Sequence, residues 1–173
     1  MNIPVEWSSG RWSQISESVL DKSQWPAGPW MAEPDFVGWH DDASGRRCMM
    51  VRGSVHGAWL GYVDAVDLLP MFERIEPRMG SWSSVEMMQE AGLPERVIRA
   101  PRYGLSYAGP AWQMGGLWLG YDNAHADDYL PGFAAKGYTR AHPSQYVTEA
   151  VAREHTLKIA AALHAFAMER KAS

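Results

Sequence analysis

The chain has 173 residues, a formal net charge of −4 and an isoelectric point of about 5.8. Its length fits one domain with a core of its own, and its apolar fraction of 46% is ordinary for a globular protein. The acidic balance excludes non-specific nucleic-acid binding, because such binding needs a basic surface that displaces counterions. A protein partner that is itself basic fits this charge.

The aromatic, sulfur and terminal residues narrow the class of protein further. Nine tryptophans and ten methionines predict a core of large side chains, a stacking pocket, or both. The single cysteine, Cys48, excludes an internal disulfide and lies in an apolar run, so we expect a buried thiol. The N-terminus lacks a signal-peptide pattern, and no window reaches the roughly 18 apolar residues of a membrane span. We therefore expect a cytoplasmic protein without membrane contact.

The N-terminal segment reads as a helix followed by an arm. Apolar residues at helical spacing predict a short helix from Trp12 to Lys22. The run 24–30 contains two prolines and a glycine, which end that helix. Trp25 and Trp30 flank the turn, and we expect them to clamp the arm onto the rest of the domain.

Strand patterns follow. Residues 36–40, 46–51 and 55–63 are rich in apolar side chains and bounded by turn-forming runs at 41–45 and 53–54. Short connections of this kind predict a meander of three antiparallel strands.

A helical insert separates this meander from the later strands. Residues 67–76 predict a short or irregular helix, because a proline interrupts them. Ser83 and Glu86 form a capping-box pattern that starts a helix over residues 84–91, and Gly92 ends it.

Three more strands and a long helix complete the pattern. Residues 96–99 and 103–107 read as strands, and 117–121 as a buried strand that enters a polar loop. Ser144 is the expected cap of a helix over residues 145–169.

The elements together predict an α+β fold in a single domain over residues 1–173. An antiparallel, meandering sheet of about five or six strands packs against the long C-terminal helix, with short helices at the N-terminus and in the insert. We assign residues 1–30 to the N-terminal helix and Trp/Pro arm, 31–143 to the sheet with its insert at about 66–92, and 144–170 to the C-terminal helix.

One six-residue pattern occurs twice. Residues 57–62 and 116–121 both read Gly-x-Trp-Leu-Gly-Tyr. Two core strands with the same packing requirement would share such a pattern. Two halves of the chain that arose by duplication would share it as well. A glycine beside a tryptophan on one strand face lets a large ring lie over bare backbone.

The loop after residue 121 holds the densest group of ionisable side chains beside a core strand. Asp122, His125, Asp127 and Asp128 fall within seven residues. They predict a divalent-metal site (Asp122, His125 and Asp128, completed by His40, His56 or His155), a catalytic pair of Asp122 and His125, or a loop held by Asx turns.

A local basic group suggests a second kind of site. Arg99 and Arg102 with Tyr103 face an aromatic strand, and arginine with an aromatic ring suits a phosphate or a nucleotide. The alternative is a salt bridge from Arg102 to the Asp-rich loop. The candidate ligand-binding residues are Arg99, Arg102, Tyr103, Tyr107, Trp118, Tyr121 and His56.

A set of residues between positions 28 and 165 forms a pattern known from other proteins. They are Gly28-Pro29-Trp30, Glu33-Pro34-Asp35, Trp39, Arg52, Gly61-Tyr62-Val63, Trp118, Gly120, Tyr121, Asp122, Ala124, His125 and Asp128. On these residues the chain resembles a family of small uncharacterised proteins encoded by phages and prophages. In that family a Gly-Tyr-Val strand precedes a His-Gly-Gly-Leu-Thr-Tyr segment, a Trp-x-Gly-Phe-Asp-x-Ala-His-x-Gly-Asp segment and a C-terminal helix, in a similar order.

This chain departs from the family at one position that matters for chemistry. Arg102 stands where the family has the histidine of His-Gly-Gly-Leu-Thr-Tyr, and this puts a His-dependent activity in doubt. The resemblance implies phage biology, in the cytoplasm of the host cell. We expect an accessory protein that binds and inhibits a host defence protein or sequesters a small anionic, nucleotide-like ligand. The alternative is a small metal- or His-dependent hydrolase or transferase that uses Asp122 and His125.

Overall fold

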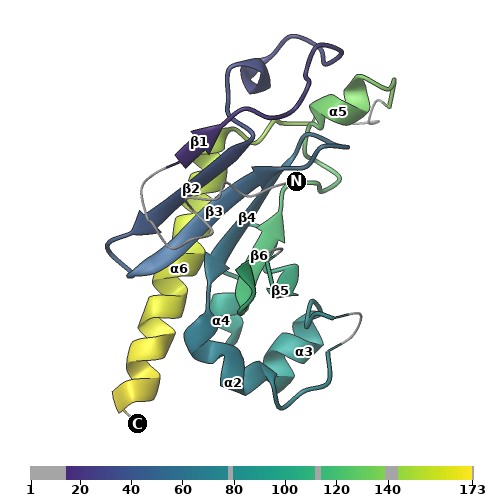
Figure 1. The fold of residues 1–173 in the computed structure, drawn as a ribbon. Coiled ribbons are helices and arrows are strands. Elements are labelled where there is room, and N and C mark those ends of the chain that lie inside the picture. Colours follow the sequence, from purple (N-terminus) through teal and green to yellow (C-terminus); the bar gives the residue numbers. More distant parts are fainter. Residues whose placement is uncertain (1–14, 78–79, 112–113, 139–143, 173) are drawn as a thin grey trace.

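One antiparallel sheet and one long helix make up the fold, and a computed structural model describes residues 15–77, 80–111, 114–138 and 144–172 (Figure 1). Six strands lie in the order β1-β2-β3-β4-β6-β5, and each neighbouring pair is antiparallel. The α+β class, the meandering sheet and the C-terminal helix are as predicted. The strands are β1 (Ile15–Glu17), β2 (Phe36–Asp41), β3 (Arg46–Arg52), β4 (Trp59–Asp64), β5 (Tyr107–Gly109) and β6 (Trp118–Asp122).

The long helix α6 (Glu149–Ala172) runs across one face of the sheet and contacts β3 and β4 (Figure 1). The short helices α2, α3 and α4 gather near the end of the sheet where β4 finishes, as the predicted insert requires. The remaining helices are η1 (Pro29–Met31), η2 (Val66–Leu68), α2 (Leu69–Phe72), α3 (Val85–Glu90), α4 (Glu95–Ile98) and α5 (Pro131–Ala134).

Two cores lie on the two faces of the sheet. The larger one fills the space between the sheet and α6, and the smaller one lies on the opposite face. Cys48 belongs to the larger core, which confirms the predicted burial of its thiol, and burial raises the pKa of that thiol. The smaller core contains Phe36, Met49, Val51, Ala111 and Trp118.

The predicted N-terminal helix is wrong where the structure describes it, and its first residues, 12–14, lie outside the described part. Ile15–Glu17 instead pairs with β2 as the edge strand β1. The backbone N–H groups of Val19 and Leu20 then donate to Asp35 Oδ2, at 3.0 and 2.9 Å, rather than to helical carbonyls. A tertiary carboxylate has outweighed a local helical pattern.

Residues 95–98 form the helix α4, so the predicted strand over 96–99 is also wrong. Pro94 lies at the N-cap of α4, where a missing N–H costs nothing, and Val97 and Ile98 are buried. The predicted strand over 103–107 is displaced, because only Tyr107 belongs to β5. The predicted strand over 55–63 begins at Trp59.

Two predicted caps are displaced as well. Ser84, not Ser83, caps α3, because its hydroxyl accepts the N–H of Met87 at 3.1 Å. Ser144 does not cap α6, which begins at Glu149. The hydroxyl of Thr148 instead accepts the N–H of Val151 at 3.4 Å.

The two copies of the repeated pattern lie in the neighbouring strands β4 and β6, where they pack in the same way. This is the arrangement expected of two core strands with one packing requirement. Gly61 pairs with Tyr121 and Tyr62 pairs with Gly120 across β4 and β6. Each tyrosine ring lies over the glycine of the other strand, so a Cβ on either glycine would strike a ring. The register is therefore fixed by two reciprocal Tyr–Gly pairs.

A buried ionic network, which no local sequence pattern indicated, joins the arm to the sheet and to α6. Arg52 is fully buried. Its Nε lies 3.1 Å from Asp35 Oδ1, its Nη2 lies 2.8 Å from Glu33 Oε2, and its Nη1 donates to Tyr146 Oη and to the carbonyl of Gly57. Such complete pairing is what a buried guanidinium requires.

Lys22 completes this network from the arm. Its Nζ lies 2.7 Å from Asp35 Oδ1 and donates to the carbonyls of Trp30 and Glu33, at 3.0 and 2.7 Å. Glu33 in turn accepts the backbone N–H of Glu149, the first residue of α6, at 3.0 Å. Several residues that carried the family resemblance therefore have a structural role in joining the arm, the sheet and the helix.

Candidate functional site

The polar loop leaves the sheet at Asp122, where both carboxylate oxygens are held. Oδ2 accepts the hydroxyl of Ser106 at 3.0 Å, and Oδ1 accepts the backbone N–H of Ala124 at 3.0 Å. The second bond is an Asx turn, which was one of the predicted roles of this loop. The side chain stays about one third exposed.

His125 lies between two carboxylates and under an aromatic ring. Its Nδ1 is 3.5 Å from Asp128 Oδ2 and 4.0 Å from Asp122 Oδ1. The ring of Tyr103 covers the imidazole, with 3.9 Å between centroids. The predicted pairing of Asp122 with His125 is therefore loose, and Asp128 is the nearer carboxylate.

Arg102 lies outside the polar loop and forms ion pairs with two of its carboxylates. Its Nη2 lies 2.6 Å from Asp127 Oδ2 and its Nη1 lies 3.4 Å from Asp128 Oδ1. Its guanidinium also lies 4.6 Å from the ring centroid of Tyr103, whose hydroxyl donates to Asp127. In the structure Arg102 therefore forms the salt bridge to the Asp-rich loop, which was the predicted alternative to an anion site.

Asp128 is the buried member of the loop. It has no exposed surface, and burial raises the pKa of its carboxyl against the lowering effect of the His125 N–H and of Arg102. The segment before α6 fastens the loop from outside, since Tyr129 donates its N–H to the carbonyl of Gln145 and Gln145 donates to that of Asp127. The loop is therefore bonded to Arg102 on one side and to the segment before α6 on the other.

His155, from α6, lies close enough to act electrostatically on this group. Burial and Lys158 lower the pKa of its imidazole, and Arg102 and Asp128 contribute with opposite signs. Its ring meets that of Tyr121 edge to face at 5.7 Å. Within the described residues, no three His, Cys, Asp or Glu side chains are arranged to hold a metal ion.

Other predicted ligand residues lie elsewhere. Arg99 is exposed and ion-paired with Glu95 on α4. Tyr121 is buried under α6, whereas Trp118 is buried in the core on the opposite face of the sheet. His56 accepts the N–H of Ala58 at 3.0 Å, and burial lowers its pKa although Asp122 acts in the opposite direction. The structure thus gathers Arg102, Tyr103, Asp122, His125, Asp127 and Asp128, and we call these six residues the loop cluster.

A tyrosine slot adjoins the loop cluster. Tyr62 and Tyr107 pair with Gly120 from the two neighbouring strands, and their rings meet edge to face at 5.6 Å. Together with Pro110 and Ala111 they line a hollow of about 250 Å³. Tyr62 was not predicted as a site residue, although its place in the repeated pattern was a signal that it would face a glycine.

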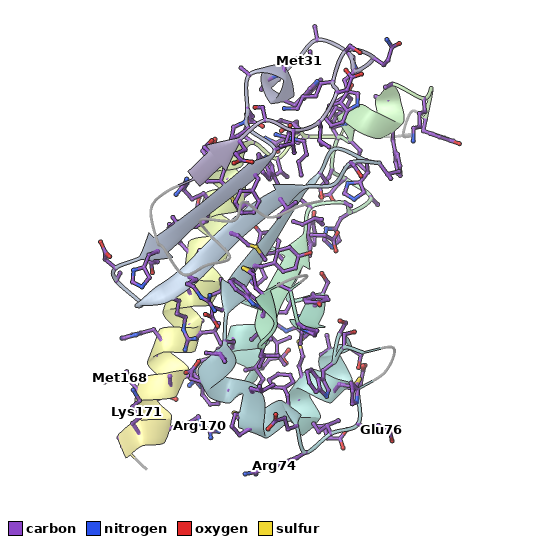
Figure 2. The ribbon with its side chains drawn as sticks, in the orientation of Figure 1. Met31, Arg74, Glu76, Met168, Arg170 and Lys171 are labelled. Carbon is purple, nitrogen blue, oxygen red and sulfur yellow. The ribbon has the colours of Figure 1, made fainter. Side chains whose placement is uncertain are left out.

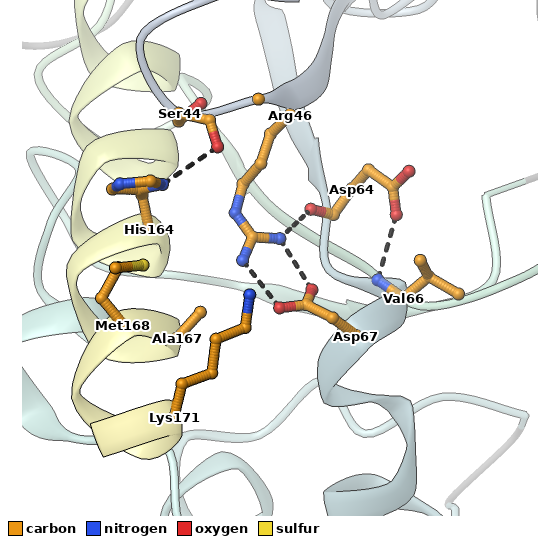
Figure 3. Close-up of a pocket in the computed structure, with 10 residues that line it drawn as sticks. Ser44, Arg46, Asp64, Val66, Asp67, His164, Ala167, Met168 and Lys171 are labelled. Atoms are coloured by element: carbon orange, nitrogen blue, oxygen red, sulfur yellow. Dashed lines mark hydrogen bonds and ion pairs between the residues drawn. The ribbon is translucent and has the colours of Figure 1, made fainter.

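A second hollow, of about 350 Å³, lies at the other end of β4 (Figure 3). Arg46 enters it from β3 and pairs with both carboxylate oxygens of Asp67, at 2.9 and 3.0 Å. His164 Nδ1, on α6, lies 3.1 Å from the carbonyl of Ser44. These bonds join the β2–β3 turn, η2 and the last turns of α6. The side chains that line the hollow therefore also hold this end of the fold together.

Comparison with known proteins gives no relative. No family model, no curated protein and no solved structure matches the chain. The expectations that came from the resemblance to phage and prophage proteins therefore stay predictions. In the part of the chain that the structure describes, no helix combines the length and the apolar character that crossing a membrane requires.

Proposed function

We propose that this protein acts by binding a partner in a fixed ratio, and that the loop cluster is its contact surface. The pairing of Arg102 with Asp127 and Asp128 carries the proposal. An arginine whose charge is met by two carboxylates of a neighbouring loop is a poor receptor for an anionic substrate. A general base must offer a ring nitrogen to a substrate proton, and Nδ1 of His125 is buried and lies toward Asp128 and Asp122.

The exposed side chains of the loop cluster are of the kind that dominates protein interfaces. Tyr103 is 42% exposed, and the side chains of Arg102 and Asp127 are 39% and 54% exposed. Tyrosine and arginine are enriched among residues whose truncation costs the most binding energy. No tryptophan in the described ranges adds to this surface as an exposed ring, because each of them is buried or half-buried.

The charge of the surface indicates the partner. Asp122 and Asp127 lie at the surface of a chain with net charge −4, which favours a partner that is basic at its binding face. The resemblance to phage-encoded proteins supports a bacterial host protein, and inhibition of a host defence protein is the corresponding role. Sequestration of a small anionic ligand fits less well, since Arg102 is already neutralised.

The test is recovery of a partner by tagged wild-type protein and by matched variants in bacterial cells. We expect the double variant Tyr103→Ala/His125→Ala to lose a host protein that the wild type retains, with at least about a tenfold rise in the Kd of the purified pair. Tyr138→Ala is the control, because Tyr138 is 67% exposed and lies outside the loop cluster.

Circular dichroism establishes that each variant is folded before it is compared. Equal recovery of the same proteins by the wild type, the double variant and the control would contradict a contact surface at the loop cluster. Turnover of a substrate that disappears in Asp122→Ala/His125→Ala would establish the enzymatic alternative instead.

A further inference from the structure

A hollow of about 350 Å³ lies where Arg46 meets Asp67, and we call it the hollow of Arg46 (Figure 3). The Arg46 side chain is only 9% exposed. Its Nη1 donates to the backbone carbonyl of Asp64 at 2.7 Å, and its two Nη atoms pair with both carboxylate oxygens of Asp67. The polar wall of the hollow is therefore held in place, and the volume lies in the range of small-molecule sites, roughly 300–1,000 Å³.

Both carboxylates that line the hollow are already paired with arginines. Asp67 forms the two-fold contact with Arg46. Asp64 Oδ2 lies 2.5 Å from Arg47 Nε, and its Oδ1 accepts the backbone N–H of Val66 at 3.0 Å. Neither carboxylate is left without a counter-charge that a further cation would have to supply.

Lys171 adds a positive charge that is not met in this way. Figure 3 shows its side chain rising from the last turn of α6, with its ammonium group directed into the hollow toward Arg46 and Asp67. Among the described residues, no carboxylate comes within the 4.0 Å of an ion pair with this ammonium group. With histidine neutral, the hollow therefore carries one positive charge in excess.

Apolar side chains complete the lining and remain in contact with water. Val66 is 52% exposed and Met168 is 54% exposed, and Ala167 lies next to Met168 on α6. Large apolar side chains that keep half of their surface exposed beside a charged hollow favour a ligand that covers apolar surface as well as meeting a charge.

We infer that the hollow of Arg46 binds a small organic monocarboxylate with an apolar body. The carboxylate would accept charge-assisted hydrogen bonds from Lys171, and the apolar body would cover Val66 and Met168. One excess positive charge matches a single negative charge, whereas a dianion such as phosphate would meet repulsion from Asp64 and Asp67. This site is separate from the loop cluster, so the inference goes beyond the proposed function.

The experiment is an NMR titration of the full chain, at constant ionic strength, with hexanoate and with hexanamide as its neutral isostere. We expect hexanoate to shift the signals of Val66, Ala167 and Met168, and to bind about fivefold more tightly than hexanamide. Lys171→Met removes the charge but keeps an unbranched apolar side chain, so hexanoate should lose this advantage. Lys158→Met is the matched control on the same helix, because Lys158 is 53% exposed and does not line the hollow.

Two further arms separate the apolar contact from the charge. Met168→Ser should weaken hexanoate and hexanamide by similar factors, about fivefold, because both probes need the apolar wall. Inorganic phosphate should bind more weakly than hexanoate, because it has no apolar body and brings a second negative charge close to Asp64 and Asp67. The NMR spectrum of each variant establishes that it is folded.

Equal affinity for hexanoate and hexanamide would overturn the inference, and so would the absence of shifts at the hollow. An unchanged hexanoate affinity in Lys171→Met would also overturn it, and would leave Lys171 as a solvated cation that complements the end of α6. Tighter binding of phosphate than of hexanoate would overturn the assignment of a monocarboxylate. The proposed function is tested separately by Tyr103→Ala/His125→Ala, because neither Tyr103 nor His125 lines the hollow.

Discussion

Arg52 shows how one side chain can hold distant segments together. Its guanidinium bonds to the arm through Glu33 and Asp35, and to the approach of α6 through Tyr146. Burial alone would raise the pKa of Glu33, but bonds from Tyr146, the Glu149 N–H and Arg52 lower it. Each charge in the network is therefore stabilised by the others, and the network acts as a unit.

Replacing Arg52 should be costly for this reason. We expect Arg52→Met to lower the free energy of unfolding by about 3–5 kcal/mol, since it leaves Glu33 without its counter-charge and Asp35 with that of Lys22 alone. Urea denaturation measures the change. Arg99→Met is the matched control, because the Arg99 side chain is 77% exposed and its loss should cost under about 0.5 kcal/mol. Similar losses in the two variants would refute the role assigned to the network.

The pair β4 and β6 sets the centre of the sheet and positions the site. Their reciprocal Tyr–Gly pairs fix the register, and that register places Asp122 opposite Leu60, at the end of the sheet where the loop cluster begins. The same register puts Tyr62 beside Gly120 and so makes one wall of the tyrosine slot. Structure and candidate site therefore depend on the same two glycines.

A side chain at Gly120 tests this dependence. We expect Gly120→Ala to lower the free energy of unfolding by about 1–3 kcal/mol, because the new Cβ overlaps the Tyr62 ring and the Gly61 carbonyl. In a Tyr62→Leu background the cost of the same change should be smaller, with a coupling of at least about 0.5 kcal/mol. Strict additivity in this double-mutant cycle would show that the ring does not lie on the glycine.

The whole molecule is an elongated sheet and helix with different features at its two ends. The exposed side chains of Met31, on the arm, and Met168, near the end of α6, lie at opposite ends (Figure 2). The loop cluster and the tyrosine slot lie along the β5 and β6 side of the sheet. The hollow of Arg46 is at the far end of β4 from the loop cluster.

Stability should depend on pH through two shielded histidines. Burial lowers the pKa values of both His56 and His155 below 6.5. The unfolded chain then binds more protons, so this stability is fully present above about pH 6.5 and is lost as the pH falls through the folded-state pKa values. The raised pKa of Asp128 has the opposite sign and is common to wild type and variant.

The measurement is the free energy of unfolding of the wild type and of His155→Gln between pH 7.5 and pH 5, by urea denaturation. We expect a smaller loss on acidification in the variant, and His56→Gln should show the same sign. His40→Gln is the control, since the His40 side chain is 38% exposed on the β2–β3 turn. Parallel curves for wild type and His155→Gln would contradict the shielding of this histidine.

Local patterns were enough to predict the strands β2, β3 and β6, the helix α3 and the long helix α6, because apolar periodicity and turn residues act over a few neighbours. They also located the polar loop that became the centre of the candidate site. They did not predict β1. Just after this strand, the backbone N–H groups of Val19 and Leu20 donate to the carboxylate of Asp35, which lies 16 and 15 residues further along the chain.

The site itself could not be assembled from local signals. The bond from Arg52 to Tyr146 spans 94 residues, and the contacts of Arg102 with Asp127 and Asp128 span 25 and 26. A pattern of residue types gives no account of which distant charges neutralise one another, or of which ring faces a glycine across a strand pair. Which charges pair and which ring faces which glycine depends on the free energy of burying these groups together. That free energy depends on the folded structure, because only folding brings the distant groups into contact.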